Sequence, residues 1–298
     1  SKRSFVNVNV YIVDGTYELF RSHFGQPPRL APDGMHVSAV RGLIQSLLFL
    51  LRERKVTHIA VAFDSEVKSF RNELFPAYKD GSDTPEELKM QFPLAERAVG
   101  ALGIVYWPMR EYEADDAIGA AAVKYSKNLT VDQVIICSPD KDLTQVVYKE
   151  KIVCLDRRKG VVLGEKGVLE KFGVLPKSIP DYLALMGDNS DGIPGIPRWG
   201  PKASSTLLER YESIEAIPND YRLWDVNVRG AAGLSNSLEE HREVVALYKD
   251  LATLRLNAPV SEKVDDLEWP GAHSDLYPKL CQELGMPNLA NQPQRWSS

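Results

Sequence analysis

Residues 10–14 read Val-Tyr-Ile-Val-Asp, a short β-branched run that ends on an acidic residue. Two later runs have the same form: residues 59–64 read Ile-Ala-Val-Ala-Phe-Asp, and residues 134–140 read Val-Ile-Ile-Cys-Ser-Pro-Asp. Such runs are typical of the buried strands of a parallel sheet. Segments with helical spacing, such as residues 40–51, alternate with them. The alternation predicts an α/β fold with a mainly parallel, twisted sheet and helices on both faces.

Each of the three runs brings an aspartate to the same edge of the predicted sheet: Asp14, Asp64 and Asp140. In open α/β sheets the reactive crevice lies beyond the carboxyl ends of the strands. Two further acidic segments follow, Glu-Ala-Asp-Asp at 113–116 and Gly-Asp-Asn-Ser-Asp at 187–191. Clustered carboxylates repel one another unless a positive charge lies between them. The pattern therefore predicts oxygen-bound divalent ions, magnesium or manganese.

Each acidic residue also has a simpler explanation. A single aspartate after a strand is usually a turn former, and acidic residues that open a helix often complement its dipole. The whole set is more specific and favours phosphoryl transfer with two ions about 3.5–4 Å apart. Haloacid-dehalogenase-type phosphatases also carry an Asp-Gly-Thr loop like residues 14–16. Their nucleophile precedes it by two residues, where this chain has Ile12, so that class is only a remote alternative.

The overall charge does not exclude a nucleic-acid partner. The 298 residues have a formal net charge of −5. Nine carboxylates lie in the suspected metal cluster, and without them the rest of the chain carries +4, which is compatible with a basic groove. These nine are Asp14, Asp64, Glu113, Asp115, Asp116, Asp140, Asp142, Asp188 and Asp191.

Other compositional features point to a cytoplasmic protein. The three cysteines, Cys137, Cys154 and Cys281, have no pairing motif, as expected for a reducing compartment. The apolar stretch at 43–51 is too short to cross a bilayer, and the N-terminus has no apolar signal segment. We therefore expect no membrane association, and a cytoplasmic location that is nucleoid-associated if the source is bacterial.

Helical patterns replace the β-rich runs beyond about residue 172. This change predicts an α/β core at 1–175 and a helical subdomain at 176–298. Residues 5–10 are expected to begin the first strand, and Asp142 to begin a helix. A single long amphipathic helix is expected at 237–254, and a frayed tail at 288–298.

A Gly/Pro-rich stretch at 187–203 is the second informative motif. Gly200 and Pro201 favour a helix start whose free N–H groups bind a phosphate, and Lys202 adds positive charge. The simpler alternative is an ordinary Gly/Pro-rich connection between helices.

In this order, the motifs resemble those of the 5′ nuclease family, which includes the 5′→3′ exonuclease domain of bacterial DNA polymerase I and the flap endonucleases. The matching pieces are Asp14-Gly15 with Arg21, Phe63-Asp64 with Phe70-Arg71, Tyr78-Lys79, residues 113–116, residues 140–143 and residues 187–195. The resemblance runs from the first strand to the helix that ends near Leu254. No polymerase follows, so we expect a stand-alone nuclease.

The resemblance implies a set of metal ligands. One ion would be held by Asp14, Asp64, Glu113 and Asp115, with Asp116 in a supporting catalytic role. A second would be held by Asp140, Asp142 and Asp191, with Asp188 nearby as a further candidate ligand. Magnesium or manganese, in two or more copies, is the expected cofactor.

The resemblance also implies DNA contacts. Lys79 and Arg71 would stand at the base of a helical arch, at about residues 70–92, and contact the scissile phosphate. Tyr78 would stack on a base, or alternatively pack the arch onto the core. A helix–turn–helix element at 195–204 would grip the duplex backbone. The other expected DNA contacts are Arg21, Gly195, Arg198, Gly200 and Lys202.

Two positions depart from the family pattern. Ser82 stands where polymerase-type members carry a basic residue, and Arg198 stands where the hairpin normally has glycine. Glycine at this turn permits the backbone to approach DNA closely and to bind a potassium ion at the hairpin, and Arg198 lacks that conformational freedom.

The expected function is that of a structure-specific 5′ nuclease, acting as flap endonuclease and 5′→3′ exonuclease in replication and repair. Its expected substrates are DNA 5′ flaps, 5′ ends or nicks, including RNA primer strands, and the expected oligomeric state is a monomer. Two alternatives stay open. One is a DNA-binding scaffold that has lost turnover, and the other is an RNA-directed 5′ nuclease.

Overall fold

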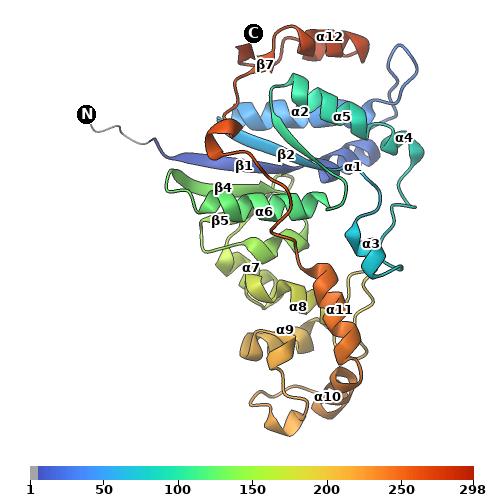
Figure 1. Ribbon diagram of the computed structural model, residues 1–298, viewed down its shortest axis with the longest axis vertical. Coiled ribbons are helices and arrows are strands. Elements are labelled where there is room, and N and C mark those ends of the chain that lie inside the picture. The colour runs from blue at the N-terminus through green and yellow to red at the C-terminus, as the bar shows by residue number, and fades with distance from the viewer. Residues whose placement is uncertain (1–5) are drawn as a thin grey trace. The chain divides into compact units, whose positions relative to one another are not determined.

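A computed structural model describes residues 6–298, and the chain forms two compact units (Figure 1). The first unit comprises the segments up to residue 69, 81–138 and 255–298, and the second comprises 70–80 and 139–254. The predicted division at residue 175 follows chain order, whereas these units are each built from segments far apart in sequence. Phe5, which the strand prediction included, lies outside the described residues.

The first unit is built on four strands in the order β3-β2-β1-β4, all paired in parallel. They are β1 (Val8–Asp14), β2 (His58–Asp64), β3 (Val105–Met109) and β4 (Val131–Cys137). Asp14 is in register with Ala62, and Val13 with Cys137, so the carboxyl ends of β1, β2 and β4 meet at one edge. The parallel pairings confirm the predicted sheet, and the β-branched residues of β4 and of β1 from Val10 onward are buried.

Helices cover both faces of these strands, as predicted (Figure 1). Helix α6 packs on β1 to β4, and in Figure 1 it lies below β1 and β2, while α2 and α5 lie above them. The helices of this unit are α1 (Gly15–Gly25), α2 (Ser38–Glu53), α4 (Glu86–Lys89), α5 (Phe92–Ala101), α6 (Ala114–Ser126) and α12 (Leu276–Glu283). Its other elements are the 3-10 helices η5 (Val264–Leu267) and η6 (Pro287–Leu289) and the strands β7 (Ala272–His273) and β8 (Trp296–Ser297). The apolar spacing that predicted α2 reflects burial of its leucines against α1 and α5.

The second unit is mainly helical. Strands β5 (Ile152–Asp156) and β6 (Val161–Leu163) form an antiparallel pair. The α-helices are α3 (Phe70–Leu74), α7 (Glu165–Phe172), α8 (Ile179–Met186), α9 (Pro201–Tyr211), α10 (Ala231–Glu240) and α11 (Arg242–Ala252). The 3-10 helices are η1 (Lys141–Val146), η2 (Pro176–Ser178), η3 (Ile214–Ala216) and η4 (Tyr221–Leu223). Helices α8 and α9 pack on each other and flank the loop at 187–200, which confirms the helix–turn–helix arrangement.

Three local predictions were wrong. The helix expected at 237–254 is broken at His241, which has φ −113° and ψ 16° and separates α10 from α11. The helix expected to begin at Asp142 is a short 3-10 helix that begins at Lys141, and Asp140 caps it by accepting a hydrogen bond from Asp142 N. The tail is not wholly frayed, since β8 pairs in parallel with β7.

Membrane insertion was not expected, and the fold offers no helix suited to it within residues 6–298: none is both long enough and apolar enough to cross a bilayer.

Candidate metal centre and nucleic-acid interface

Asp14 is buried at the end of β1, where the chain turns directly into α1. Its Oδ1 accepts a hydrogen bond from Tyr17 N at 3.0 Å, and its Oδ2 accepts one from Ser138 Oγ at 2.9 Å. The strand-ending aspartate is therefore a helix cap, as the simpler explanation held. The cap also fixes the carboxylate at the sheet edge where ligands bind in this fold class.

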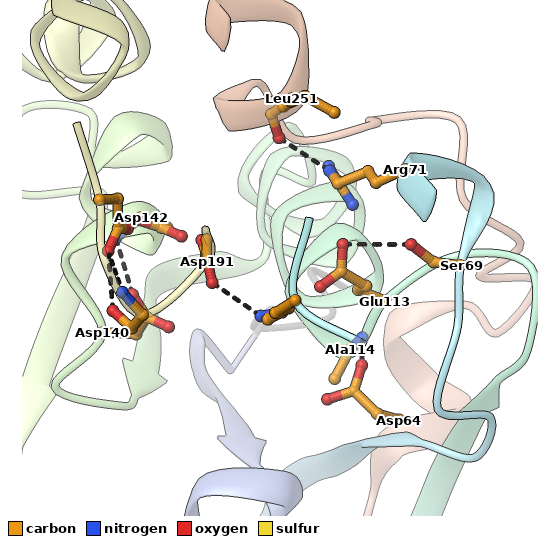
Figure 2. Close-up of polar contacts among 12 residues, drawn as sticks. Asp64, Ser69, Arg71, Glu113, Ala114, Asp140, Asp142, Asp191 and Leu251 are labelled. Atoms are coloured by element: carbon orange, nitrogen blue, oxygen red, sulfur yellow. Dashed lines mark hydrogen bonds and ion pairs between the residues drawn. The ribbon is translucent and has the colours of Figure 1, made fainter. Parts of the chain in front are cut away.

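Asp64 and Glu113 lie at the N-terminus of α6. Asp64 Oδ1 accepts a hydrogen bond from Ala114 N at 2.7 Å, and Glu113 Oε2 lies 3.4 Å from Ser69 Oγ (Figure 2). Asp115 stands in the first turn of the same helix and is half-buried. The positive end of the helix dipole partly offsets the repulsion among these carboxylates. We call Asp14, Asp64, Glu113 and Asp115 the first acidic group, and all four belong to the first unit.

Asp116 differs from its neighbours because it is fully buried and both of its oxygens are engaged by the backbone. Oδ2 accepts from Glu113 N at 2.9 Å and Oδ1 accepts from Arg255 N at 2.8 Å. We infer that Asp116 positions Glu113 and the segment at residue 255. The supporting catalytic role expected for Asp116 stays a prediction.

The second acidic group lies in the second unit and consists of Asp140, Asp142, Asp188 and Asp191. Asp142, Asp188 and Asp191 are buried, and each offers one carboxylate oxygen within 4.8 Å of the others. Asp142 Oδ1 is buried and has no hydrogen-bond partner among the described residues. A buried carboxylate oxygen without a partner is costly. An all-oxygen set with one such atom therefore fits a divalent cation.

The electrostatics of the second acidic group agree with this fit. Burial raises the pKa of Asp142 well above its ordinary value, and the negative charges of Asp140 and Asp191 raise it further. Burial also raises the pKa of Asp140, although the hydrogen bond from Asp142 N opposes the shift. Burial alone would raise the pKa of Asp188, but hydrogen bonds from Ser190 and the charge of Lys141 hold it below its usual range. The group thus needs added positive charge for its members to ionise together.

Two lysines supply part of that charge. Lys79 Nζ lies 2.9 Å from Asp191 Oδ1, and Lys141 Nζ lies 3.1 Å from Asp188 Oδ2. The main chain also joins the partners, because Lys79 N donates to Asp191 O at 3.0 Å. The motifs of the sequence predict Lys79 at a phosphate and indicate no role for Lys141. The position of Lys141 between Asp140 and Asp142 is the feature of the sequence that could have indicated its role.

Asp142→Asn is expected to stabilise the metal-free chain at alkaline pH. The pKa of Asp142 is higher in the folded chain than in the unfolded chain. The protonated carboxyl therefore adds to the free energy of unfolding fully below the unfolded-state pKa, and this stability is lost as pH rises through the folded-state pKa. Asparagine avoids the buried charge above that point. In chelator, the Tm of Asp142→Asn should exceed that of the wild type by about 2–4 °C at about pH 8, and the difference should shrink toward about pH 4. Equal differences at both pH values would contradict this assignment.

Arg71 is buried, with 2 % exposure. Its Nε donates to Leu251 O at 2.8 Å and its Nη2 donates to Thr253 O at 3.0 Å, at the carboxyl end of α11 (Figure 2). These bonds anchor α3 to α11. Contact of Arg71 with the scissile phosphate stays a prediction, and the geometry adds a structural role.

Tyr78 has 5 % exposure, and its ring centroid lies 5.7 Å from Lys79 Nζ. This burial supports the packing alternative over base stacking. Arg21, another expected DNA contact, is half-buried on α1 and forms an ion pair with buried Glu18 at 3.2 Å.

The hairpin residues differ in conformation. Gly195 has φ +73°, and an added Cβ would lie 2.7 Å from Gly187 N and from Met186 C. Arg198 is exposed and has φ +74°, the left-handed conformation that favours glycine. A Cβ on Gly233 would lie 3.0 Å from Arg198 Nη1, so the arginine side chain runs along the start of α10. Lys202 is exposed in the first turn of α9.

Gly195→Ala and Gly200→Ala form a matched pair of variants. Gly195→Ala combines a positive φ with backbone overlap and should cost at least about 2 kcal/mol of unfolding free energy. Gly200 has φ −90° and no described atom within 4 Å of an added Cβ, so Gly200→Ala should lose much less Tm, limited to the small cost of alanine at an N-cap. Thermal unfolding of both variants tests this, and an equal loss of Tm would contradict the assignment of strain to Gly195.

Comparisons with known proteins agree with the geometry. Residues 9–173 match the family "5'-3' exonuclease, N-terminal resolvase-like domain", and residues 174–275 match "5'-3' exonuclease, C-terminal SAM fold". A 5'-3' exonuclease of Aquifex aeolicus is 35% identical over 284 residues, which cover 95% of this chain and 94% of that protein. The chain belongs to the 5'-3' exonuclease family.

Other members of the family are longer proteins. DNA polymerase I of Bacillus caldotenax is 34% identical over 292 residues, which cover 96% of this chain but only 32% of the polymerase. This chain therefore corresponds to about a third of that relative's length.

Solved structures support the fold. The flap endonuclease of bacteriophage T5, solved as a pseudo-enzyme–product complex with DNA and metal ions, has a TM-score of 0.65 and 20% identity. The match covers 95% of this chain and 99% of that one. At this identity the likeness establishes the shared fold of the family.

Proposed function

We propose that this chain is a divalent-metal-dependent, structure-specific 5′ nuclease that hydrolyses DNA phosphodiester bonds at 5′ flaps, 5′ ends and nicks. The observation that carries the proposal is the buried cluster of Asp142, Asp188 and Asp191, in which Asp142 Oδ1 has no hydrogen-bond partner within residues 6–298. Family membership supplies the reaction class, because the relatives are 5'-3' exonucleases and the T5 protein is a flap endonuclease. Magnesium and manganese both suit the oxygen donors.

Each acidic group has its own part in the proposed reaction. Asp14, Asp64, Glu113 and Asp115 offer the carboxylates of one ion site, and Asp142 and Asp191, supported by Asp140, offer those of the other. When bound, the ions supply positive charge that stabilises the attacking and leaving oxygens. Lys79 binds the scissile phosphate through its ammonium, and water is the nucleophile.

In this proposal the hairpin binds the double-stranded part of the DNA. Gly195 lets the chain turn sharply, Gly200 leaves the N-terminus of α9 uncapped, and Lys202 adds charge beside it. The free N–H groups of such a helix end bind phosphate. Backbone contacts carry no sequence information, so we expect little sequence preference. A potassium ion at this hairpin, a monomeric state and a cytoplasmic location complete the proposal.

Arg198→Gly separates backbone strain from DNA contact. Glycine adopts φ +74° without penalty, so the variant should gain about 1 kcal/mol of unfolding free energy. If the guanidinium contacts phosphate, the slope of log affinity against log salt should flatten by about one unit on flaps and plain duplex alike. Binding titrations from low to moderate salt test this. An unchanged slope would mean that Arg198 only packs along α10.

The direct assay of the proposed function uses a 5′-flap substrate labelled at both ends, with magnesium, manganese or chelator. Cleavage near the junction that depends on the ion supports the nuclease. Tight binding without products supports the scaffold alternative. A second substrate with an RNA 5′ strand tests the RNA-directed alternative, which predicts faster cleavage of that strand than of DNA.

A further inference from the structure

The two lysines of the second acidic group form ion pairs of different construction. Asp188 is fully engaged: Oδ2 lies 3.1 Å from Lys141 Nζ, while Oδ1 accepts from Ser190 N at 3.2 Å and from Ser190 Oγ at 2.7 Å. Both carboxylate oxygens therefore have partners from the protein. A divalent ion on Asp188 would have to share these oxygens with Lys141 or Ser190.

Lys79 and Asp191 are joined differently. The main-chain bond from Lys79 N to Asp191 O holds the two segments together without the side chains. Gly192 allows this approach, because its φ is +75° and an added Cβ would lie 2.6 Å from Ala77 O. The Lys79 side chain is 43% exposed, so its ammonium can leave Asp191 for water while the backbone stays in place.

The charges favour such an exchange. With its four carboxylates ionised, the second acidic group together with Lys79 and Lys141 has a formal charge of −2, which matches one divalent ion. The Lys79 ammonium lies 2.9 Å from Asp191 Oδ1, in the place that a cation on that oxygen would take. Two cations that close repel strongly in a partly buried site.

We propose that Asp188 and Lys141 form a fixed internal ion pair, and that a divalent ion bound by Asp142 and Asp191 displaces the Lys79 ammonium from Asp191. Ion binding thereby frees Lys79 for the phosphate of the substrate, and Asp188 acts as a positioning residue for Lys141. The inference rests on the proposed function, because it takes Asp142 and Asp191 as ion ligands. It makes the ion and Lys79 competitors for one carboxylate.

Lysine acetylation of the full chain, without DNA, tests the exchange. The rate at each lysine is followed by mass spectrometry with and without saturating Mg²⁺, with exposed Lys55 as the reference. The Lys79 side chain is 43% exposed, so its ion pair protects the ammonium only modestly, and Lys79 should be modified about fivefold faster once Mg²⁺ is bound. The rate at Lys141 should not change. No change or slowing at Lys79, or a parallel rise at Lys141, would overturn the proposal.

Calorimetric titration with Mg²⁺ gives the reciprocal measurement. Lys79→Met removes the competitor and should tighten binding about fivefold, whereas Lys55→Met should leave it unchanged. In Asp191→Asn, the rate of Lys79 modification should no longer respond to Mg²⁺. Equal Mg²⁺ affinity in wild type and Lys79→Met would overturn the competition.

The same titration separates this inference from the proposed function. If Asp142→Asn binds Mg²⁺ as tightly as the wild type does, the ion site itself is wrong and both proposals fail. If binding depends on Asp142 but Lys79 modification does not respond to Mg²⁺, only the exchange fails.

Discussion

Asp142→Asn should abolish cleavage while duplex binding survives. Asparagine has nearly the shape of aspartate but lacks the charge that an ion needs, and no residue in the described part of the chain forms a hydrogen bond with Asp142 Oδ1. Loss of the ion removes several kcal/mol of transition-state stabilisation, so the single-turnover rate should fall by about 10³-fold or more. Rates come from rapid quench on a 5′-flap substrate, and affinities from fluorescence anisotropy in Ca²⁺.

Asp132→Asn is the matched control for that experiment, because Asp132 is an exposed aspartate on β4 outside both acidic groups. It should keep the wild-type rate. Residual cleavage by Asp142→Asn within about tenfold of wild type at saturating Mg²⁺ would rule out a ligand role. A large loss of duplex affinity would instead indicate damage to the fold of the second unit.

Lys79→Ala has the second-largest expected effect. In the proposed reaction the Lys79 ammonium binds the reacting phosphate. The single-turnover rate should therefore fall by about 10²–10³-fold, with only a small loss of affinity for DNA. Lys89→Ala is the control, because Lys89 ends the short helix α4 and forms no part of either acidic group. If Lys79→Ala weakens only the affinity for DNA, Lys79 is an ordinary contact to the DNA phosphate backbone.

The strand framework and most acidic residues could be predicted because their signals are local. The β-branched runs at 10–14, 59–64 and 134–137 are buried parallel strands, and strand direction alone brings Asp14 and Asp64 to one edge. The helix after Glu113 was also legible, since acidic residues complement a helix start.

The missed features depend on contacts between residues far apart in sequence. The pairing of Lys141 with Asp188 joins residues that no periodicity relates. The burial of Arg71 depends on carbonyls at the end of α11, 180 residues or more along the chain. The break at His241 lies within an apolar pattern that continues on both sides, so the spacing gave no stop signal.

The order of the reaction in Mg²⁺ tests the central claim most directly, namely that two carboxylate groups hold ions that act together on one phosphate. The measurement is the single-turnover rate of 5′-flap cleavage at subsaturating Mg²⁺, with ionic strength held constant. A plot of log rate against log Mg²⁺ concentration should have a slope of about 2 or more, because two ions are needed at once. A slope of about 1 across the whole range below saturation would contradict the account.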